Sequence, residues 1–324
     1  VKVEDLSTEM LAYLKKNSRI LHIFSLIDNT IALETENIES IKKLNGVKRV
    51  YESGKAKLML TDALNRIGIF DVQRRNVYGD GVWIGVIDSG IEMSDPLVSG
   101  SVVSERDFTE EGSYDPIGHG TTIARILKTV APNISFINAK VIDRTGEADE
   151  INIMRAVEWC ANSGVEVMNL SLGISRKCDG SCPLCELVEA ASKKTIIVAA
   201  VGNDGPEGDN ISCPANSISC IGVGSIEEDD TVADYSSRGT PSNLKPDIIA
   251  PGCIRYGNFK LEGTSIAAPF VSASAALLLS ACATDKKRVV EAILNTADDK
   301  GFPKWVQGNG SIRTDKALEM IICG

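Results

Sequence analysis

The sequence predicts an α/β protein in which a small N-terminal α+β unit precedes a doubly wound parallel sheet. The run at residues 81–87 is continuously apolar, which is typical of a strand buried on both faces of a parallel sheet. Strand-like and helix-like segments then alternate as far as residue 224, whereas residues 1–58 follow a different order. The 324 residues are enough for one large and one small domain, so we expect domains at residues 1–58 and 59–324.

The N-terminal unit is expected to form a small sheet backed by two helices. Its elements are expected, from residue spacing, as helices at residues 6–16 and 38–44 and strands at 19–26, 30–34 and 47–52. The stretch at residues 53–60 is basic and then apolar, and we expect it to be extended.

The larger unit is expected to place its functional groups at the carboxyl ends of its parallel strands. The expected strands lie at residues 81–87, 134–142, 165–170, 195–201 and 219–224, and the expected helices at 120–130, 149–162, 185–193 and 266–279.

Composition narrows the classes of function. The formal net charge is -10, and the acidic residues are scattered rather than gathered in blocks. This pattern argues against nucleic acid as a partner. No stretch is apolar over the ~20 residues that a membrane helix needs. We therefore expect a monomer that binds neither nucleic acid nor a membrane.

The cysteine content suggests a compartment. Nine cysteines are many for a cytosolic enzyme, and the number is odd. We expect disulfides with one thiol left over, which favours a secreted, extracellular protein over an intracellular one. The sequence begins at Val1, so any signal peptide falls outside it. Cys160 and Cys282 lie in helical patterns and are expected to pack as small hydrophobic residues.

The stretch at residues 263–269, Gly-Thr-Ser-Ile-Ala-Ala-Pro, carries the first sign of chemistry. The apolar run after it predicts a helix that is buried nearly all round, with Ser265 in its first turn. A hydroxyl there lies at the positive end of the helix dipole, among N–H groups without helical partners. This position suits a nucleophile whose reaction forms an oxyanion. The alternative is that Thr264 and Ser265 only cap a core helix.

Three further polar residues follow strands or begin a helix of the same expected sheet. Asp88 ends the first strand, His119 lies in Gly-His-Gly-Thr at a helix start, and Asn203 follows the strand at 195–201. Aspartate and asparagine at such places often only form turns. The second histidine, His22, lies in an alternating strand, where a structural role is expected. Together with Ser265, the set indicates a serine nucleophile with a base and an oxyanion donor.

With these residues in place, the chain resembles the subtilisin-like serine proteases, or subtilases, over about residues 61–324. The matching motifs are Val-Ile-Asp-Ser-Gly, Gly-His-Gly-Thr, Asn-Leu-Ser-Leu-Gly, Ala-Ala-Val-Gly-Asn, Lys-Pro-Asp-Ile-Ile-Ala-Pro-Gly and Gly-Thr-Ser-Ile-Ala-Ala-Pro, at residues 86–90, 118–121, 169–173, 199–203, 245–252 and 263–269. The likeness extends to Gly-Asn-Gly at residues 308–310.

The resemblance implies a serine endopeptidase that needs no cofactor for catalysis and acts on polypeptides. Ser265 would attack the peptide carbonyl, His119 would transfer the proton, and Asp88 would orient His119. Asn203 and the backbone N–H of Ser265 would hold the oxyanion. The resemblance also implies the substrate-binding residues: Ser171, Leu172 and Gly173 as an edge strand, Gly146, Glu147 and Ala148 as the facing strand, and Ala200, Val201 and Gly202 as the wall of the primary specificity pocket.

The resemblance further implies that residues 1–58 are a subtilase-type propeptide, which assists folding and then inhibits the active site. Parallel sheets depend on non-local contacts and fold slowly, so a folding template has a physical rationale. We expect self-cleavage between about residues 55 and 62. The alternative is a catalytically silent relative that binds peptides or a partner protein.

The sequence departs from the family pattern in the histidine motif and in the helix that follows it. Many subtilases have His-Gly-Thr-His-Val-Ala-Gly, where this chain has Thr122 and Arg125. The run at residues 127–132 is short, so the calcium-binding loop of many relatives is expected to be absent. A structural calcium site at the acidic turn 227–230 is the alternative to a solvated turn. In the expected facing strand, Glu147 occupies a position where subtilases usually have a second glycine. If Glu147 points at bound peptide, it would favour basic substrate side chains nearby.

Cys178, Cys182 and Cys185 form a Cys-x3-Cys-x2-Cys motif that leaves three interpretations open. The first is disulfide bonding, with Cys213 or Cys220 as partners or with those two paired to each other. The second is a structural zinc ion with one further ligand. The third is an iron–sulfur cluster, as in a metal–cysteine enzyme. The compartment argument favours disulfides, and free thiols are the remaining alternative.

Overall fold

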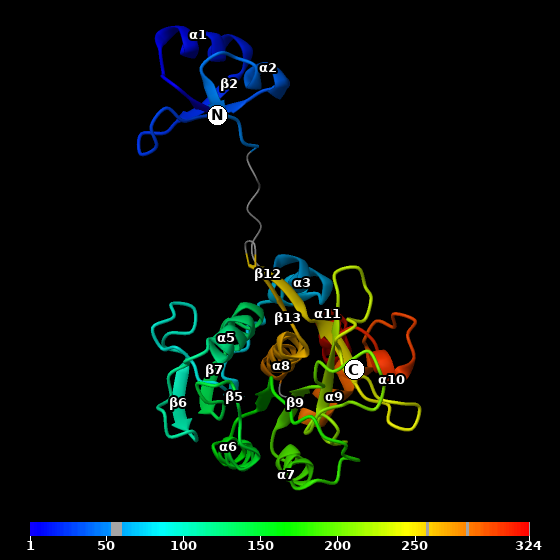
Figure 1. The fold of residues 1–324 in the computed structure, drawn as a ribbon. Coiled ribbons are helices and arrows are strands. Elements are labelled where there is room, and N and C mark those ends of the chain that lie inside the picture. Colours follow the sequence, from blue (N-terminus) through cyan, green and yellow to red (C-terminus); the bar gives the residue numbers. More distant parts are fainter. Residues whose placement is uncertain (53–59, 257–258, 283–284, 324) are drawn as a thin grey trace. The chain divides into compact units, whose positions relative to one another are not determined.

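The computed structural model describes residues 1–52, 60–256, 259–282 and 285–323. The chain forms two compact units, Val1–Lys57 and Leu58–Gly324 (Figure 1). Most of the segment at residues 53–60, for which we expect an extended chain, lies outside the described residues.

The N-terminal unit contains the expected helix–strand–strand–helix–strand order with one additional strand before it. Its elements are β1 (Lys2–Val3), α1 (Thr8–Asn17), β2 (Arg19–Ile23), β3 (Ile31–Glu34), α2 (Ile38–Lys42) and β4 (Val47–Arg49). β2 pairs with β3 and β1 with β4, both antiparallel, and a bridge from Lys2 to Thr30 links the pairs. Leu14, Ile31 and Ile41 form its buried core.

The larger unit has a seven-stranded parallel sheet, which confirms the predicted fold class. The strands are β5 (Trp83–Asp88), β6 (Val102–Asp107), β7 (Ser135–Lys140), β8 (Val167–Leu170), β9 (Ile196–Ala200), β10 (Ile221–Ile226) and β11 (Ile248–Pro251), in the spatial order β11-β10-β9-β8-β5-β7-β6. Later strands therefore lie on both sides of β5, the first strand of this sheet in the sequence, as in doubly wound folds. The edge strands β6 and β11 were not expected: β6 is mostly exposed and polar, and the four residues of β11 fall within the motif at residues 245–252.

Helices cover both faces of this sheet (Figure 1). One layer contains α5 (His119–Val130), α8 (Thr264–Ala281), α9 (Lys286–Asn295) and α11 (Thr314–Cys323), and the other contains α6 (Glu150–Asn162) and α7 (Pro183–Ser192). The two layers bury alternate residues of β5: Val86 packs in the cluster of α5 and α8, and Ile87 in the cluster of α6 and α7. Shorter elements complete the unit: α3 (Thr61–Arg66), α4 (Ile69–Gln73), α10 (Lys304–Gln307) and the antiparallel pair β12 (Cys253–Tyr256) and β13 (Phe259–Glu262).

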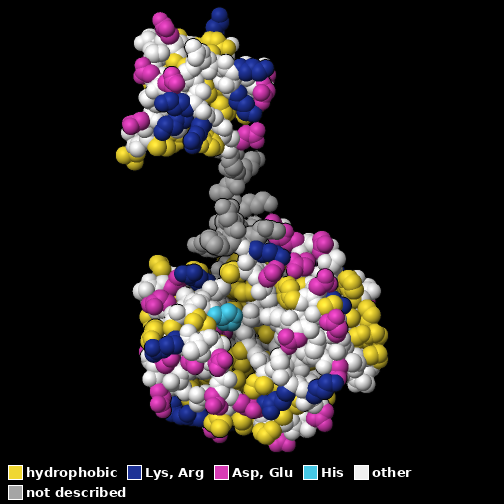
Figure 2. Space-filling view, in the orientation of Figure 1, with side chains coloured by type: hydrophobic (Ala, Val, Ile, Leu, Met, Phe, Trp, Pro, Cys, Tyr) yellow, Lys and Arg dark blue, Asp and Glu magenta, His cyan; other side chains and the backbone are white. Residues whose placement is uncertain are grey.

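The central helix of the larger unit is α8. It contacts α5, α9, α11 and strands β8, β9, β10 and β11. Of the helices in the described part of the chain, α8 alone is long and apolar enough to cross a membrane, and 78% of it is buried inside the protein. Its lack of a polar face follows from contacts on all sides. Figure 2 shows acidic and basic side chains intermingled over the visible face of the larger unit.

Truncating α8 tests its role as the core helix. Phe270 on α8 is fully buried in the main core cluster, so Phe270→Ala should lower the free energy of unfolding by about 3–5 kcal/mol. The measurement is chemical denaturation in a Ser265→Ala background, which removes self-digestion. Met320→Ala on the outer face of α11, where Met320 is 42% exposed, is the matched control. A loss below about 1 kcal/mol for Phe270→Ala would contradict the packing described.

Candidate active site

Three neighbouring strands bring polar residues to one edge of the sheet. Asp88 ends β5, Ser171 directly follows β8, and Asn203 lies shortly after β9. These strands are adjacent in the order β9-β8-β5 and parallel. Because their carboxyl ends lie along the same edge, the three residues meet there. α5 and α8 pack against each other, and they carry His119 and Ser265 in their first turns.

A buried carboxylate is paired with the imidazole. The Nδ1 atom of His119 lies 2.7 Å from Oδ1 of Asp88, and the same oxygen accepts a 2.7 Å bond from Ser89 N–H. The Asp88 side chain is 0% exposed and the His119 side chain 31% exposed. This geometry fixes Nδ1 as the protonated nitrogen and leaves Nε2 free to act as a base. Gly120 permits the approach, since a Cβ there would lie 2.2 Å from the Gly90 carbonyl oxygen.

The charge of Asp88 sets the basicity of His119. Asp88 raises the pKa of His119 above its ordinary value of 6.5, burial opposes the shift, and Asp115 adds a further increase. The neutral imidazole, the form that can accept a proton, therefore predominates only above this raised pKa.

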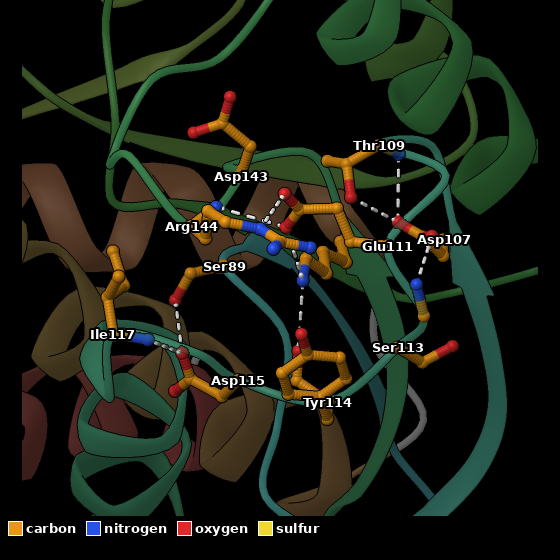
Figure 3. Close-up of polar contacts among 12 residues, drawn as sticks. Ser89, Asp107, Thr109, Glu111, Ser113, Tyr114, Asp115, Ile117, Asp143 and Arg144 are labelled. Atoms are coloured by element: carbon orange, nitrogen blue, oxygen red, sulfur yellow. Dashed lines mark hydrogen bonds and ion pairs between the residues drawn. The ribbon is translucent and has the colours of Figure 1, made fainter.

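Asp115 was missed in the sequence analysis, and it organises the loop that leads to His119 (Figure 3). Its Oδ1 accepts bonds from Ser89 Oγ at 2.8 Å and Gly118 N–H at 2.8 Å. Its Oδ2 accepts bonds from the N–H and Oγ1 of Thr121 at 2.8 and 2.6 Å. Burial raises the pKa of Asp115, but these hydrogen bonds outweigh it and hold the pKa below the ordinary value. The carboxylate thus links the strand that carries Asp88 to the helix that begins with His119.

A second cluster anchors the same loop to the end of β7 (Figure 3). Lys140 pairs with Asp88 in the sheet register and is fully buried. Its Nζ lies 3.3 Å from Glu111 Oε2, donates to the Tyr114 carbonyl at 3.2 Å, and lies 4.6 Å from the centre of the Tyr114 ring. Arg144 Nε donates to Glu111 Oε1 at 2.7 Å. A lysine inside an apolar strand run was the signal in the sequence that could have indicated a buried ion pair.

Ser265 and Asn203 lie together around Gly263. The point where a Cβ on Gly263 would stand is 3.1 Å from Ser265 Oγ and 3.4 Å from Asn203 Nδ2. The Oδ1 atom of Asn203 accepts bonds from Thr264 N–H and Oγ1 at 2.9 and 3.0 Å. These bonds orient the amide so that its NH₂ group stays available as a donor. Ser171 Oγ donates to the Ser265 carbonyl at 2.8 Å and ties α8 to the end of β8.

The structure joins the expected residues as two pairs, His119 with Asp88 and Ser265 with Asn203. Among the described residues there is no hydrogen bond between the His119 imidazole and the Ser265 hydroxyl. Such contacts are often long in unliganded enzymes and shorten in the complex with substrate.

The segments expected to bind substrate differ in conformation. Ser171 is buried, Leu172 half-buried and Gly173 exposed in the non-helical segment after β8. Ala200 and Val201 are buried at the end of β9 and Gly202 is half-buried. The residues expected as a facing strand, 146–148, follow a turn at residues 144–145 and are not part of a strand, and Asp143 N–H donates to the Glu147 carbonyl across this turn. Ala148 forms only an isolated bridge with Ile142, and Glu147 is exposed.

The expected disulfides are wrong for this structure. Eight of the cysteines carry free thiols: Cys160, Cys178, Cys182, Cys185, Cys213, Cys220, Cys282 and Cys323. Cys213 lies with Cys178, Cys182 and Cys185 rather than bonded to Cys220. The expectation of an extracellular protein rested on disulfides inferred from the cysteine count, so it loses this support. Cys160 is fully buried, as expected, and Cys282 is half-buried.

A titration of the histidine tests the electrostatics described here. In the Ser265→Ala chain the imidazole of His119, followed by NMR, should titrate above 6.5. Asp88→Asn should lower this pKa strongly because it removes the main negative charge, and Asp115→Asn should lower it less. Asp143→Asn is the control and should leave it unchanged. A pKa at or below 6.5 in the parent, or one insensitive to Asp88→Asn, would contradict the pairing.

Comparisons with known proteins agree with this geometry. The family model described as "Subtilase family" matches residues 79–311. Subtilisin DY of Bacillus licheniformis is 33% identical over 269 residues, which cover 76% of this chain and 94% of that protein. Thermitase of Thermoactinomyces vulgaris is 30% identical over 74% of this chain and 90% of that protein. A solved lanthipeptide protease shares the fold, with a TM-score of 0.69 and 24% identity over 81% of this chain and 95% of its own. The chain belongs to the subtilase family and is a subtilisin-like serine protease.

Proposed function

We propose that the protein is an endopeptidase whose catalytic triad is Ser265, His119 and Asp88. The observation that carries this assignment is the hydrogen bond between the buried Asp88 and His119 Nδ1, at the edge of the sheet where Ser265 lies in the first turn of α8. The alternative of a catalytically silent relative has no support from the site, because the serine, histidine and carboxylate are all present.

In the proposed reaction, Ser265 Oγ forms a bond to the carbonyl carbon of the substrate as His119 Nε2 takes its proton. The imidazolium is stabilised by Asp88 and passes the proton to the leaving amine as the peptide bond breaks. Water then adds to the acyl-enzyme with His119 again as base, which releases the acid and restores Ser265. The raised pKa of His119 implies that activity falls as the pH drops through that value.

The oxyanion of each tetrahedral intermediate would be held by Asn203 Nδ2 and the backbone N–H of Ser265. Asn203 suits this role because Thr264 fixes its oxygen and so aims its NH₂ group. Ser265 N–H suits it because the first turn of a helix has no internal acceptor for this donor. Fixed donors of this kind stabilise the developing charge without reorganisation.

Substrate would bind as an extended strand beside residues 171–173, with a side chain directed to the pocket lined by Ala200, Val201 and Gly202. The exposed backbone at Gly173 supports such strand addition. Residues 146–148 would line the other side of the substrate, and the exposed Glu147 would favour basic side chains nearby.

We propose that the enzyme does not require a calcium ion. The acidic turn at residues 227–230 is better explained by its protein partners: Asp230 pairs with Arg66 at 2.6 Å and Lys300 at 3.1 Å, and Asp229 accepts bonds from Thr231. α5 also runs without interruption to Val130.

The N-terminal unit is proposed to be a propeptide that the enzyme removes from itself. Its compact fold of helices and short strands, with a core of its own, supports an independently folded segment of this kind.

Two substitutions test the catalytic assignment on an unfolded protein substrate. Ser265→Ala should lower kcat by several orders of magnitude. Asn203→Ala should lower kcat by roughly 10²- to 10³-fold, the loss known for the equivalent donor of a subtilisin. Asn162→Ala, an exposed position on α6, is the control. Wild-type turnover by Ser265→Ala would refute the proposal.

N-terminal sequencing tests self-processing. Freshly purified wild-type protein should acquire a new N-terminus between about residues 55 and 62, whereas Ser265→Ala should keep the one it was made with. Full activity of a chain that still begins at Val1 would rule the propeptide role out.

A further inference from the structure

Four cysteine side chains of the larger unit converge on one point. Cys178 and Cys182 come from the loop before α7, Cys185 from the first turn of α7, and Cys213 from the segment after β9. Their Sγ atoms all lie within 4.8 Å of one another. The sequence motif supplies three of these thiols, and the fold adds Cys213 as the fourth.

The separations between the sulfurs indicate the chemistry of the cluster. Cys178 and Cys185 are 3.9 Å apart, and Cys182 and Cys213 are 3.7 Å apart. A disulfide needs about 2.05 Å, which is far shorter. A tetrahedral ion with Zn–S bonds of about 2.3 Å places its sulfurs about 3.8 Å apart. An iron–sulfur cluster would space them further, because iron and sulfide lie between the cysteines.

We propose that Cys178, Cys182, Cys185 and Cys213 bind one Zn²⁺ ion in a closed tetrathiolate site. Four thiolates fill a tetrahedral coordination sphere and leave no position for substrate or water, so the ion is structural. Gly180 N–H donates to Cys178 Sγ at 3.3 Å. Cys182 caps α7, and Cys185 lies in its first turn, where the helix dipole favours negative charge.

The site lies between two segments that the proposed function assigns to substrate binding. Ile174 follows Gly173 and exchanges two backbone bonds with Cys213, at 2.8 and 3.0 Å. The neighbouring Ser212 N–H donates to the Val201 carbonyl at 2.8 Å. One ion would therefore fix the edge segment at 171–174 against the wall of the specificity pocket. This consequence rests on the proposed function, whereas the metal site itself does not.

Metal content tests the site directly. The full Ser265→Ala chain is produced with zinc, purified anaerobically without reductant, and analysed by elemental mass spectrometry and intact mass. We expect about one zinc per chain, and a large loss of zinc in Cys178→Ser and Cys213→Ser. Cys282→Ser, outside the cluster, is the matched control and should keep its zinc.

Three results would overturn the proposal: two disulfides, seen as a mass lower by four hydrogens; iron in place of zinc; or zinc retained after the cluster substitutions. If those variants do not fold, Co²⁺ is titrated into the chelator-treated Ser265→Ala chain. A strong thiolate-to-cobalt charge-transfer band that saturates at one equivalent supports the site, and its absence refutes it.

The proposed effect of the zinc site on substrate binding is tested by a separate measurement. Removing zinc from the wild-type enzyme should raise KM for a peptide substrate more than it lowers kcat, and adding zinc should restore KM. An unchanged KM would reject the link while the metal site stands. A wild-type enzyme that holds zinc but hydrolyses no peptide would instead refute the proposed function.

Discussion

The candidate active site depends on the pairing of a fully buried carboxylate with an imidazole. A buried charge is costly unless it is paired and hydrogen-bonded. Oδ1 of Asp88 meets both conditions through His119 and Ser89 N–H, whereas the buried Oδ2 has no hydrogen-bond partner among the described residues. Asp88 can be buried because it ends a central strand, and His119 can reach it because Gly120 allows close approach to Gly90. A side chain at residue 120 would force the helix away from the strand and separate the pair.

Two groups of polar contacts hold Asp88 and His119 in place. Asp115 joins the strand end to the helix start, and buried Lys140, paired with Glu111, anchors the loop in which Asp115 lies. Such networks are rigid when their members are satisfied. On the other side, α8 is apolar all round, so its first turn can be held at the sheet edge by packing along its length. The site therefore combines a polar support for His119 with an apolar support for Ser265.

The sequence predicted the central strands and the long helices because each leaves a strong local signal, and it singled out the four residues that are proposed to form the site. Continuous apolar runs predicted β5 and β9, and the motifs around Asp88, His119, Asn203 and Ser265 match a known family. The edge strand β6 was missed because an exposed, polar strand has no such run, and β11 was recognised only as part of the family motif at residues 245–252. Asp115 was missed, and Cys213 could be named only as a possible disulfide partner, because the contacts of both residues depend on the tertiary fold. The disulfide prediction was wrong for the same reason: sulfur positions depend on the fold rather than on spacing.

The central claim is that Asp88, His119, Asn203 and Ser265 act on one substrate carbonyl. The most direct test is a crystal structure of the wild-type enzyme after reaction with a peptidyl phosphonate. The account predicts a covalent bond from Ser265 Oγ to phosphorus, one phosphoryl oxygen within hydrogen-bonding distance of Asn203 Nδ2 and Ser265 N, and His119 Nε2 beside Oγ. An adduct on another residue, or an imidazole that stays out of reach of the adduct, would contradict it.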